Sequence, residues 1–137
     1  MADLIRSAQY FKVQIADKPG ELAGLLAPLD EAGVNLLAVH AFPRNRRTQV
    51  DVAPEDPTTF KNVAKVHRLK IVGPKTCFIV DGDDRPGALA GLTEQLSTAK
   101  INLVAVTGRS AGQGRFGAIL WVKPRHVKKA AKVLGIG

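Results

Sequence analysis

The chain contains the same short polar turn twice, and its residue types are suited to binding an anion. The turn reads DKPGELAGL at residues 17–25 and DRPGALAGL at residues 84–92. Each copy stands where a strand-like segment meets a helix-like one, and the first amide groups of a helix attract anions because they lack internal partners and carry the positive end of the helix dipole. The glycine of each turn would let a ligand approach the backbone, and Lys18 or Arg85 adds a cation. A carboxylate is therefore a natural guest.

A purely structural role explains the same turn equally simply. Asp17 and Asp84 could be helix N-caps, and the glycines could permit close packing of helix against sheet. Asn35 and Asn102 are a second polar feature, each sixteen residues after the proline of its turn. An asparagine there could be a turn residue that tolerates unusual backbone angles. If the next strand returns antiparallel to the helix, each asparagine lies far from its own turn and would have to reach the turn of a neighbouring domain to share a site.

The repeated turn belongs to a duplication that covers nearly the whole chain. At an offset of 67, residues 17–39 align with 84–106 without a gap, and 13 of those 23 positions are identical. Farther on, residues 52–54 align with 122–124 at an offset of 70, so the second copy has three extra residues. We place them in the glycine-bearing stretch 112–114, where a hairpin loop would tolerate an insertion.

Hydrophobic periodicity predicts the same elements in both copies. The expected elements are first strands at 11–15 and 77–80, first helices at about 22–32 and 89–99, second strands at 34–42 and 101–107, third strands at 48–52 and 116–122, second helices at about 56–66 and 125–134, and a fourth strand at 69–72 in the first copy only. This order is the split βαβ arrangement βαββαβ.

We therefore expect an α+β fold of two ferredoxin-like βαββαβ domains, at residues 8–73 and 74–137. Each should have an antiparallel sheet with its helices on one face. The second copy lacks an obvious fourth strand, because the sequence runs out at 133–137. Either that sheet keeps an open edge, or residues 2–8 or a partner chain fill it.

The combination of D-[KR]-P-G-x-L with [VI]-N-L at the start of the second strand resembles the ACT domain. It occurs twice and covers about residues 10–72 and 76–137. The resemblance implies that such units pair side by side and bind small ligands, usually amino acids, at the interface between paired units. It also implies that backbone amides of the turn, the polar residue two before the proline and the asparagine contribute. The predicted ligand-binding residues are Asp17, Lys18, Pro19, Gly20, Glu21, Leu22 and Asn35 in the first copy, and Asp84, Arg85, Pro86, Gly87, Ala88, Leu89 and Asn102 in the second.

One departure from the ACT pattern bears on the ligand. Some amino-acid-binding members have asparagine before the proline, whereas this chain has aspartate at both positions. An aspartate suits the ammonium of a ligand and repels its carboxylate.

Catalysis finds little support in these residues. His40, His67 and His126 lack metal-ligand spacing, no serine or cysteine has an evident base, and Cys77 lies in an apolar run typical of a buried, inert thiol. We expect a non-catalytic regulatory protein without metal or cofactor that binds an amino acid or a similar ligand at paired domains. We also expect a homodimer, and any regulated enzyme would be a separate molecule.

Nucleic-acid binding is the alternative function, because the formal net charge is +8 and the same element order builds RNA-recognition modules. The excess gathers in the hairpin tip around 44–47 and near the end around 123–132. The strands carry too few aromatic residues to stack bases, so we consider nucleic acid an unlikely partner. No apolar run approaches a membrane span and the first residues do not resemble a signal peptide, so we expect a cytoplasmic protein.

The third strand of the second copy indicates that a sheet face is covered. Leu120 and Val122 match the inward-facing Val50 and Val52, which leaves Trp121 on the opposite face. A large apolar group is not expected on a solvated sheet face, so we predict that another domain or subunit covers Trp121.

Overall fold

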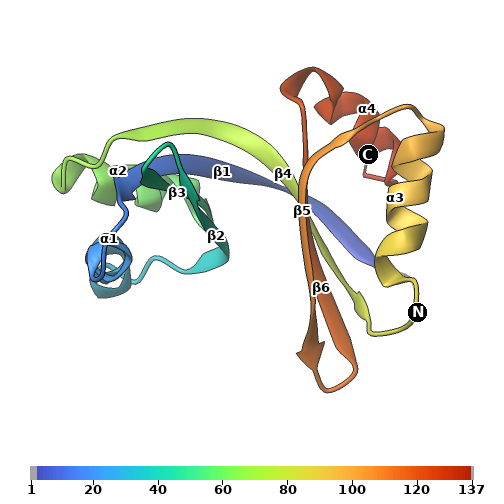
Figure 1. Ribbon diagram of the computed structural model, residues 1–137, viewed down its shortest axis with the longest axis horizontal. Coiled ribbons are helices and arrows are strands. Elements are labelled where there is room, and N and C mark those ends of the chain that lie inside the picture. The colour runs from blue at the N-terminus through green and yellow to red at the C-terminus, as the bar shows by residue number, and fades with distance from the viewer. Residues whose placement is uncertain (1–2, 137) are drawn as a thin grey trace. The chain divides into compact units, whose positions relative to one another are not determined.

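The computed structural model describes residues 3–136, and both copies have the predicted order of elements (Figure 1). The first copy is built from β1 (Leu4–Ala16), α1 (Glu21–Glu31), β2 (Leu36–Arg44), β3 (Arg47–Pro54), α2 (Pro57–Val66) and the start of β4 (Ile71–Asp83). The second copy is built from the remainder of β4, α3 (Ala88–Thr98), β5 (Leu103–Gly112), β6 (Arg115–Val122), a 3₁₀ turn η1 (Pro124–His126) and α4 (Val127–Val133).

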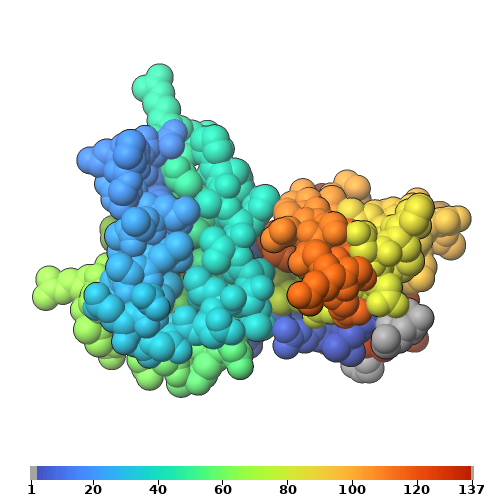
Figure 2. Space-filling model, turned by 90° about the horizontal axis from the view of Figure 1, so that it is seen from below, coloured from blue at the N-terminus to red at the C-terminus, as the bar shows by residue number. Residues whose placement is uncertain are grey.

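The first unit buries one face of its sheet under its two helices. β1 and β3 pair antiparallel with Phe11 opposite Val52, and the alternate residues of these strands form a core with α1 and α2. Phe60 of α2 anchors this core, with its ring centroid 4.9 Å from that of Phe11. β2 and β3 are joined by a tight turn that projects from this unit (Figure 2). The predicted arrangement of helices on one face is confirmed.

The second unit repeats this core with its own residues. β4 and β6 pair antiparallel with Phe78 opposite Leu120, and these residues pack with Leu92 and Leu96 of α3 and with Ala130 of α4. The predicted insertion of three residues in the hairpin loop is wrong, because residues 45–46 and 113–114 are connections of equal length. Leu120 lies opposite Phe78 as Val52 lies opposite Phe11, so the second copy has one extra residue up to this point, and the irregularity between Ser110 and Gly112 of β5 accommodates it.

The missing fourth strand of the second copy is supplied by the first residues of β1. The hydrogen-bonded strand order is β2-β3-β1-β4-β6-β5, and the segment up to Ala8 forms one compact unit with residues from Thr76 onward, while Gln9–Lys75 form the other. Ile5 packs against the core of the second unit. Of the three alternatives left open by the sequence, the N-terminal segment is therefore the one that the chain uses.

The same exchange makes β4 a single continuous strand, although the sequence pattern indicated separate strands at 69–72 and 77–80. Its first residues close the sheet of the first unit, and the remainder begins the second unit. Tyr10 lies beside Gly73 and Asp3 lies beside Gly82, so β1 and β4 run antiparallel. The predicted domain ranges, 8–73 and 74–137, do not include this exchange of strand ends.

The four α-helices of residues 3–136 all end in the same backbone motif. At the end of α1, the amide of Val34 donates to the carbonyl of Leu29, and the amide of Gly33 donates to that of Asp30. This is the Schellman pattern, in which the residue after the cap adopts a positive φ and the following residue is apolar. The corresponding positive-φ residues of the other three helices are Arg68, Lys100 and Gly135.

The Schellman motif shows whether the two asparagines have unusual backbone angles. The positive φ falls on Gly33 and Lys100, two residues before each asparagine, and neither Asn35 nor Asn102 has a positive φ. The interpretation of these residues as turn residues with unusual backbone angles is therefore wrong.

Two further expectations concern buried side chains. Cys77 is buried, as predicted. Leu120 and Val122 belong to the core beneath the helices, and Trp121 is only 5% exposed although it is not part of that core. Which domain or subunit covers Trp121 stays a prediction. None of the helices in the described part of the chain is long and apolar enough to cross a membrane.

Candidate functional site

Both repeated turns start their helices with a left-handed glycine. Gly20 is the N-cap of α1 with φ 88°, and Gly87 is the N-cap of α3 with φ 78°. Neither helix has a side-chain cap, so the interpretation of Asp17 and Asp84 as N-caps is wrong. The positive φ explains why glycine stands there, since other residues adopt this conformation only at a cost.

The two aspartates are held by hydroxyl groups of the neighbouring hairpins. Thr48 Oγ1 donates to Asp17 Oδ1 at 3.3 Å, and Ser110 Oγ donates to Asp84 Oδ2 at 2.8 Å. Thr48 pairs with Pro43 across the first hairpin, and Ser110 occupies the place of Pro43 in the second copy. In both copies the hydroxyl that orients the carboxylate comes from the same cross-strand residue pair of the hairpin, but from opposite strands of it.

The cations beside the two turns differ in availability. The side chain of Lys18 is 68% exposed, and its Nζ lies 3.7 Å from Glu21 Oε1. Arg85 instead donates two hydrogen bonds, of 3.1 and 3.0 Å, to the carboxylate of Asp3, and it also donates to the carbonyl of Asp83. These hydrogen bonds from Arg85 to Asp3 raise the pKa of the guanidinium. An anion at the second turn would have to compete with Asp3 for this cation.

The two asparagines also differ. Asn35 Nδ2 donates to Glu55 Oε2 at 2.7 Å, so the carboxylate of the same unit already engages this amide. Asn102 instead lines a hollow of about 350 Å³ at the junction of α3 and β5. The other lining residues are Thr93, Leu96, Ser97, Lys100, Ile101 and Leu103.

Within one unit the turn and the asparagine lie at opposite ends of a helix. α3 has 11 residues, so its N-terminal turn and Asn102 are separated by a helix about 16 Å long. The turn and the asparagine of one unit therefore lie apart, as the antiparallel return of the strand predicts. The other predicted site residues are either exposed in the turn, namely Pro19 and Pro86, partly or fully buried at the start of the helix, namely Ala88, Leu22 and Leu89, or paired with Lys18, namely Glu21.

The repeat pattern does not single out Ser97 or Lys100, which line this hollow. Lys100 aligns with Gly33 of the first copy, and that substitution at a position of positive φ was the only available signal. Lys100 places a cation beside Asn102 that the first copy lacks at the equivalent position.

The strands that follow the asparagines are the two ends of the strand order, so each has a free edge among the described residues. Apolar side chains are exposed there, with Val39 on β2 at 41% and Val104 and Val106 on β5 at 62% and 43%. An exposed edge that carries apolar side chains can pair with another strand.

Solved structures share this tandem arrangement. A scan against models of protein families finds no match, and no curated protein sequence matches the chain significantly. Protein BT0572 from Bacteroides thetaiotaomicron superposes with a TM-score of 0.82 at 16% identity, over 95% of this chain and 88% of that one. The tandem ferredoxin-like fold expected from the ACT resemblance is thus confirmed.

The same fold occurs in regulatory parts of aspartate kinases. The regulatory subunit of aspartate kinase from Thermus thermophilus, in its ligand-free form, has a TM-score of 0.65 at 15% identity and matches 96% of this chain and 93% of its own. A structure of aspartokinase alpha and beta subunits has a TM-score of 0.66 at 15% identity, with coverages of 98% and 95%.

Proposed function

We propose that the protein is a non-catalytic regulator that binds a small amino acid where two of its units pair. The observation that carries this proposal is the hollow lined by Asn102 and Lys100, next to the free edge of β5. Its likeness in fold to regulatory subunits of aspartate kinase supports a regulatory role.

The hollow has the chemistry that one end of an amino acid needs. The ammonium of Lys100 can pair with a carboxylate, and the amide of Asn102 can donate to it. Leu96, Ile101 and Leu103 offer apolar contacts. The ammonium of the ligand would be bound by the aspartate of a DKPG or DRPG turn from the paired unit, because Asp17 and Asp84 each have a second carboxylate oxygen beyond the one that accepts the hydroxyl.

Pairing along the edges of β2 or β5 would bring such half-sites together and cover the exposed valines. We therefore propose a homodimer, and a regulated enzyme that is a separate molecule. The carboxylate of Glu55 already holds Asn35, so we expect the Asn102 half-site to bind more tightly than the Asn35 half-site.

The test is a thermal-shift screen with each proteinogenic amino acid at millimolar concentration. A ligand that binds only the folded state raises the melting temperature. At a ligand concentration of a hundred times Kd, it increases the free energy of unfolding by about 2.7 kcal/mol. No shift with any of the amino acids would contradict the proposal.

Matched variants then locate the site. Asn102→Ala and Lys100→Met should each weaken binding of the identified amino acid about tenfold, since each removes a hydrogen-bonding partner of its carboxylate. Arg68→Met is the control for Lys100→Met, because it removes a cation from the equivalent position at the end of α2. Unchanged affinity in the double variant of Asn102 and Lys100 would show that the ligand binds elsewhere.

A further inference from the structure

The positive charge of this protein is concentrated in its last third. The 12 acidic residues and 12 of the 20 Lys and Arg residues lie within residues 1–94, so this part has no formal net charge. The entire excess of +8 comes from residues 95–137, which contain no Asp or Glu. The cations of this segment therefore lack acidic neighbours along the chain.

The excess is most dense around η1 and α4. Lys123 and Arg125 are exposed, and so are three lysines of α4, Lys128, Lys129 and Lys132. Glu94 lines a separate groove together with Val133 of α4. Neither Lys128 nor Lys132 makes an ion pair within the described part of the chain.

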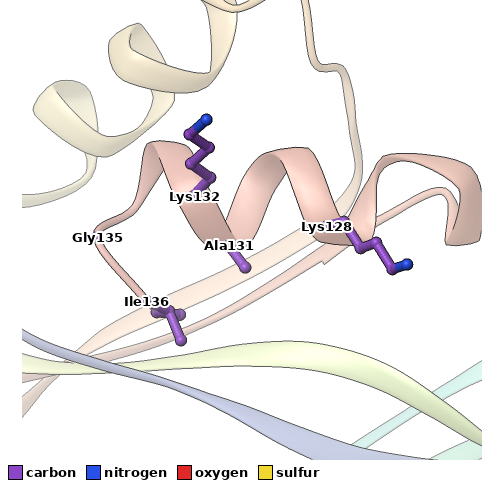
Figure 3. Close-up of a pocket in the computed structure, with 5 residues that line it drawn as sticks. All are labelled: Lys128, Ala131, Lys132, Gly135 and Ile136. Carbon is purple, nitrogen blue, oxygen red and sulfur yellow. The ribbon is translucent and has the colours of Figure 1, made fainter.

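These cations border an apolar hollow. Lys128 and Lys132 line an open hollow of about 600 Å³ together with Ala131, Gly135 and Ile136 (Figure 3). Figure 3 shows Ala131 and Ile136 pointing to the same side of α4, whereas the two lysine side chains extend away from the helix in different directions. Lys128 extends toward the side on which the apolar pair lies, and Lys132 extends toward the opposite side of the helix.

The backbone fixes the position of that apolar pair. The amide of Ile136 donates to the carbonyl of Ala131 at 2.8 Å, and the amide of Gly135 donates to that of Lys132 at 3.2 Å. In this Schellman motif the residue after the positive-φ glycine folds back onto the helix. The floor of the hollow is therefore set by the helix end and does not depend on a ligand.

We propose that α4 is a docking surface for an acidic peptide segment of a partner protein, with an apolar side chain of that segment in the hollow and its carboxylates on Lys128 and Lys132. Charge complementarity selects an acidic partner, and the apolar floor of a hollow that both lysines line favours a peptide over a nucleic-acid backbone, which has no apolar group to place there. This surface is independent of the amino-acid site in the proposed function.

The test uses fluorescence anisotropy with the full chain and three labelled probes near physiological salt. The first probe is a 12-residue peptide of glutamates around two central leucines, the second has serines in place of the leucines, and the third is a 12-base-pair DNA duplex. We expect the leucine peptide to bind about tenfold more tightly than the serine peptide, because burying apolar side chains stabilises the complex by on the order of 1 kcal/mol or more.

Two double variants provide the matched comparison. The double variant Lys128→Glu with Lys132→Glu should weaken binding of the leucine peptide about tenfold, because both attractive charges become repulsive. Lys61→Glu with Lys65→Glu makes the same change at the same spacing on α2 of the first unit and should leave affinity nearly unchanged.

Three results with the parent chain would overturn the proposal. They are the absence of peptide binding, equal binding of the leucine and serine peptides, and tighter binding of the DNA duplex than of the leucine peptide. Equal losses in the two double variants would also overturn it, because they would indicate general attraction of polyanions. None of these results bears on the thermal shift by amino acids, so the two proposals fail independently.

Discussion

At the scale of single residues, the duplication shows where the two copies have diverged in chemistry. Gln49 and Asp51 are buried polar side chains of β3, whereas Gly117 and Ile119 hold the equivalent places in the register of the second copy. Gln49 Nε2 donates to Asp51 Oδ1 at 3.1 Å. Burial raises the pKa of Asp51, an effect that this hydrogen bond and the positive charges of His40, Lys12 and Lys75 oppose only in part.

This carboxylate should cost stability at neutral pH. A pKa raised in the folded state means that the folded protein binds the proton more tightly than the unfolded chain, so stability falls as the pH rises through the range between the two pKa values. We expect Asp51→Asn, which retains an oxygen for Gln49, to melt a few degrees higher than the parent at pH 7. The difference should shrink as the pH falls toward 3.8, the ordinary value for aspartate.

Thermal melts of the two proteins between pH 3.5 and 8 measure this effect. Asp81→Asn is a suitable control, because Asp81 is a partly exposed aspartate on β4. A lower melting temperature of Asp51→Asn at pH 7 would show that the attraction of His40, Lys12 and Lys75 outweighs the burial of the carboxylate.

Residue types predicted the repeated turn but not the task of its aspartate. The pattern D-[KR]-P-G located both helix starts correctly, because proline and glycine restrict the backbone there. It left open whether Asp17 and Asp84 cap the helix, and the structure gives them hydroxyl partners, Thr48 and Ser110, on the hairpins. These partners are 31 and 26 residues away, so they depend on the pairing of strands and no local pattern indicates them.

At the scale of elements, corresponding helices of the two copies differ in the residue that adopts the positive φ at the helix end. In each pair of helices, one copy has glycine at this position and the other has a residue with a side chain. Gly33 aligns with Lys100 in the sequence, and Arg68 and Gly135 hold the same place in the hydrogen-bonded ends of α2 and α4. All four residues have positive φ in the same Schellman motif. The chain thus contains its own comparison of glycine with a side chain in a left-handed conformation.

We expect Arg68→Gly to stabilise the first unit and Gly33→Ala to destabilise it, each by about 1 kcal/mol, because a side chain in the left-handed region meets its own backbone. A Cβ at Gly33 would have no neighbour within 4 Å, so crowding by other residues would not confuse the comparison. Urea unfolding measures both changes. An increase in stability for Gly33→Ala would contradict the argument, since loss of backbone freedom in the unfolded chain would then dominate.

The sequence pattern located the helices and hairpins well because each is a local arrangement with its own periodicity. The first helix of the first copy, for example, follows from the spacing of Leu22, Leu25 and Leu29. The long strands were not predicted, since an alternating pattern shows that a strand exists but not which sheet it joins. The pattern therefore predicts two strands where the single strand β4 continues from Ile71 to Asp83.

At the scale of the whole molecule, β1 and β4 exchange their ends between the two units. Residues 71–75 of β4 close the first unit, and the segment before Gln9 closes the second. The two hydrogen bonds between Arg85 and Asp3 fasten that segment at its beginning, 82 residues away in sequence. Gly82 has no side chain at the point where Asp3 passes. A duplication with two self-contained copies would need neither contact.

The sheet of the second unit is therefore completed by a segment from the start of the chain. This N-terminal segment should govern the stability of the second unit. Removing residues 1–8 would leave the edge of β4 over residues 76–83 without its partner and expose the side of the core that Ile5 covers. We expect a lower melting temperature and faster amide exchange in β4 beyond residue 76 and in β6, while residues 9–75 keep their protection.

Single substitutions separate the fastening contact from the strand itself. Arg85→Gln removes the ion pair with Asp3 and should lower the melting temperature less than the deletion does, because the strand can still pair. Arg115→Gln is the matched control, since it removes the ion pair of 2.9 Å with Asp83 in the same unit without touching the N-terminal segment. If amide exchange in β4 beyond residue 76 is as slow in the deletion variant as in the full chain, the N-terminal segment does not hold the second sheet together.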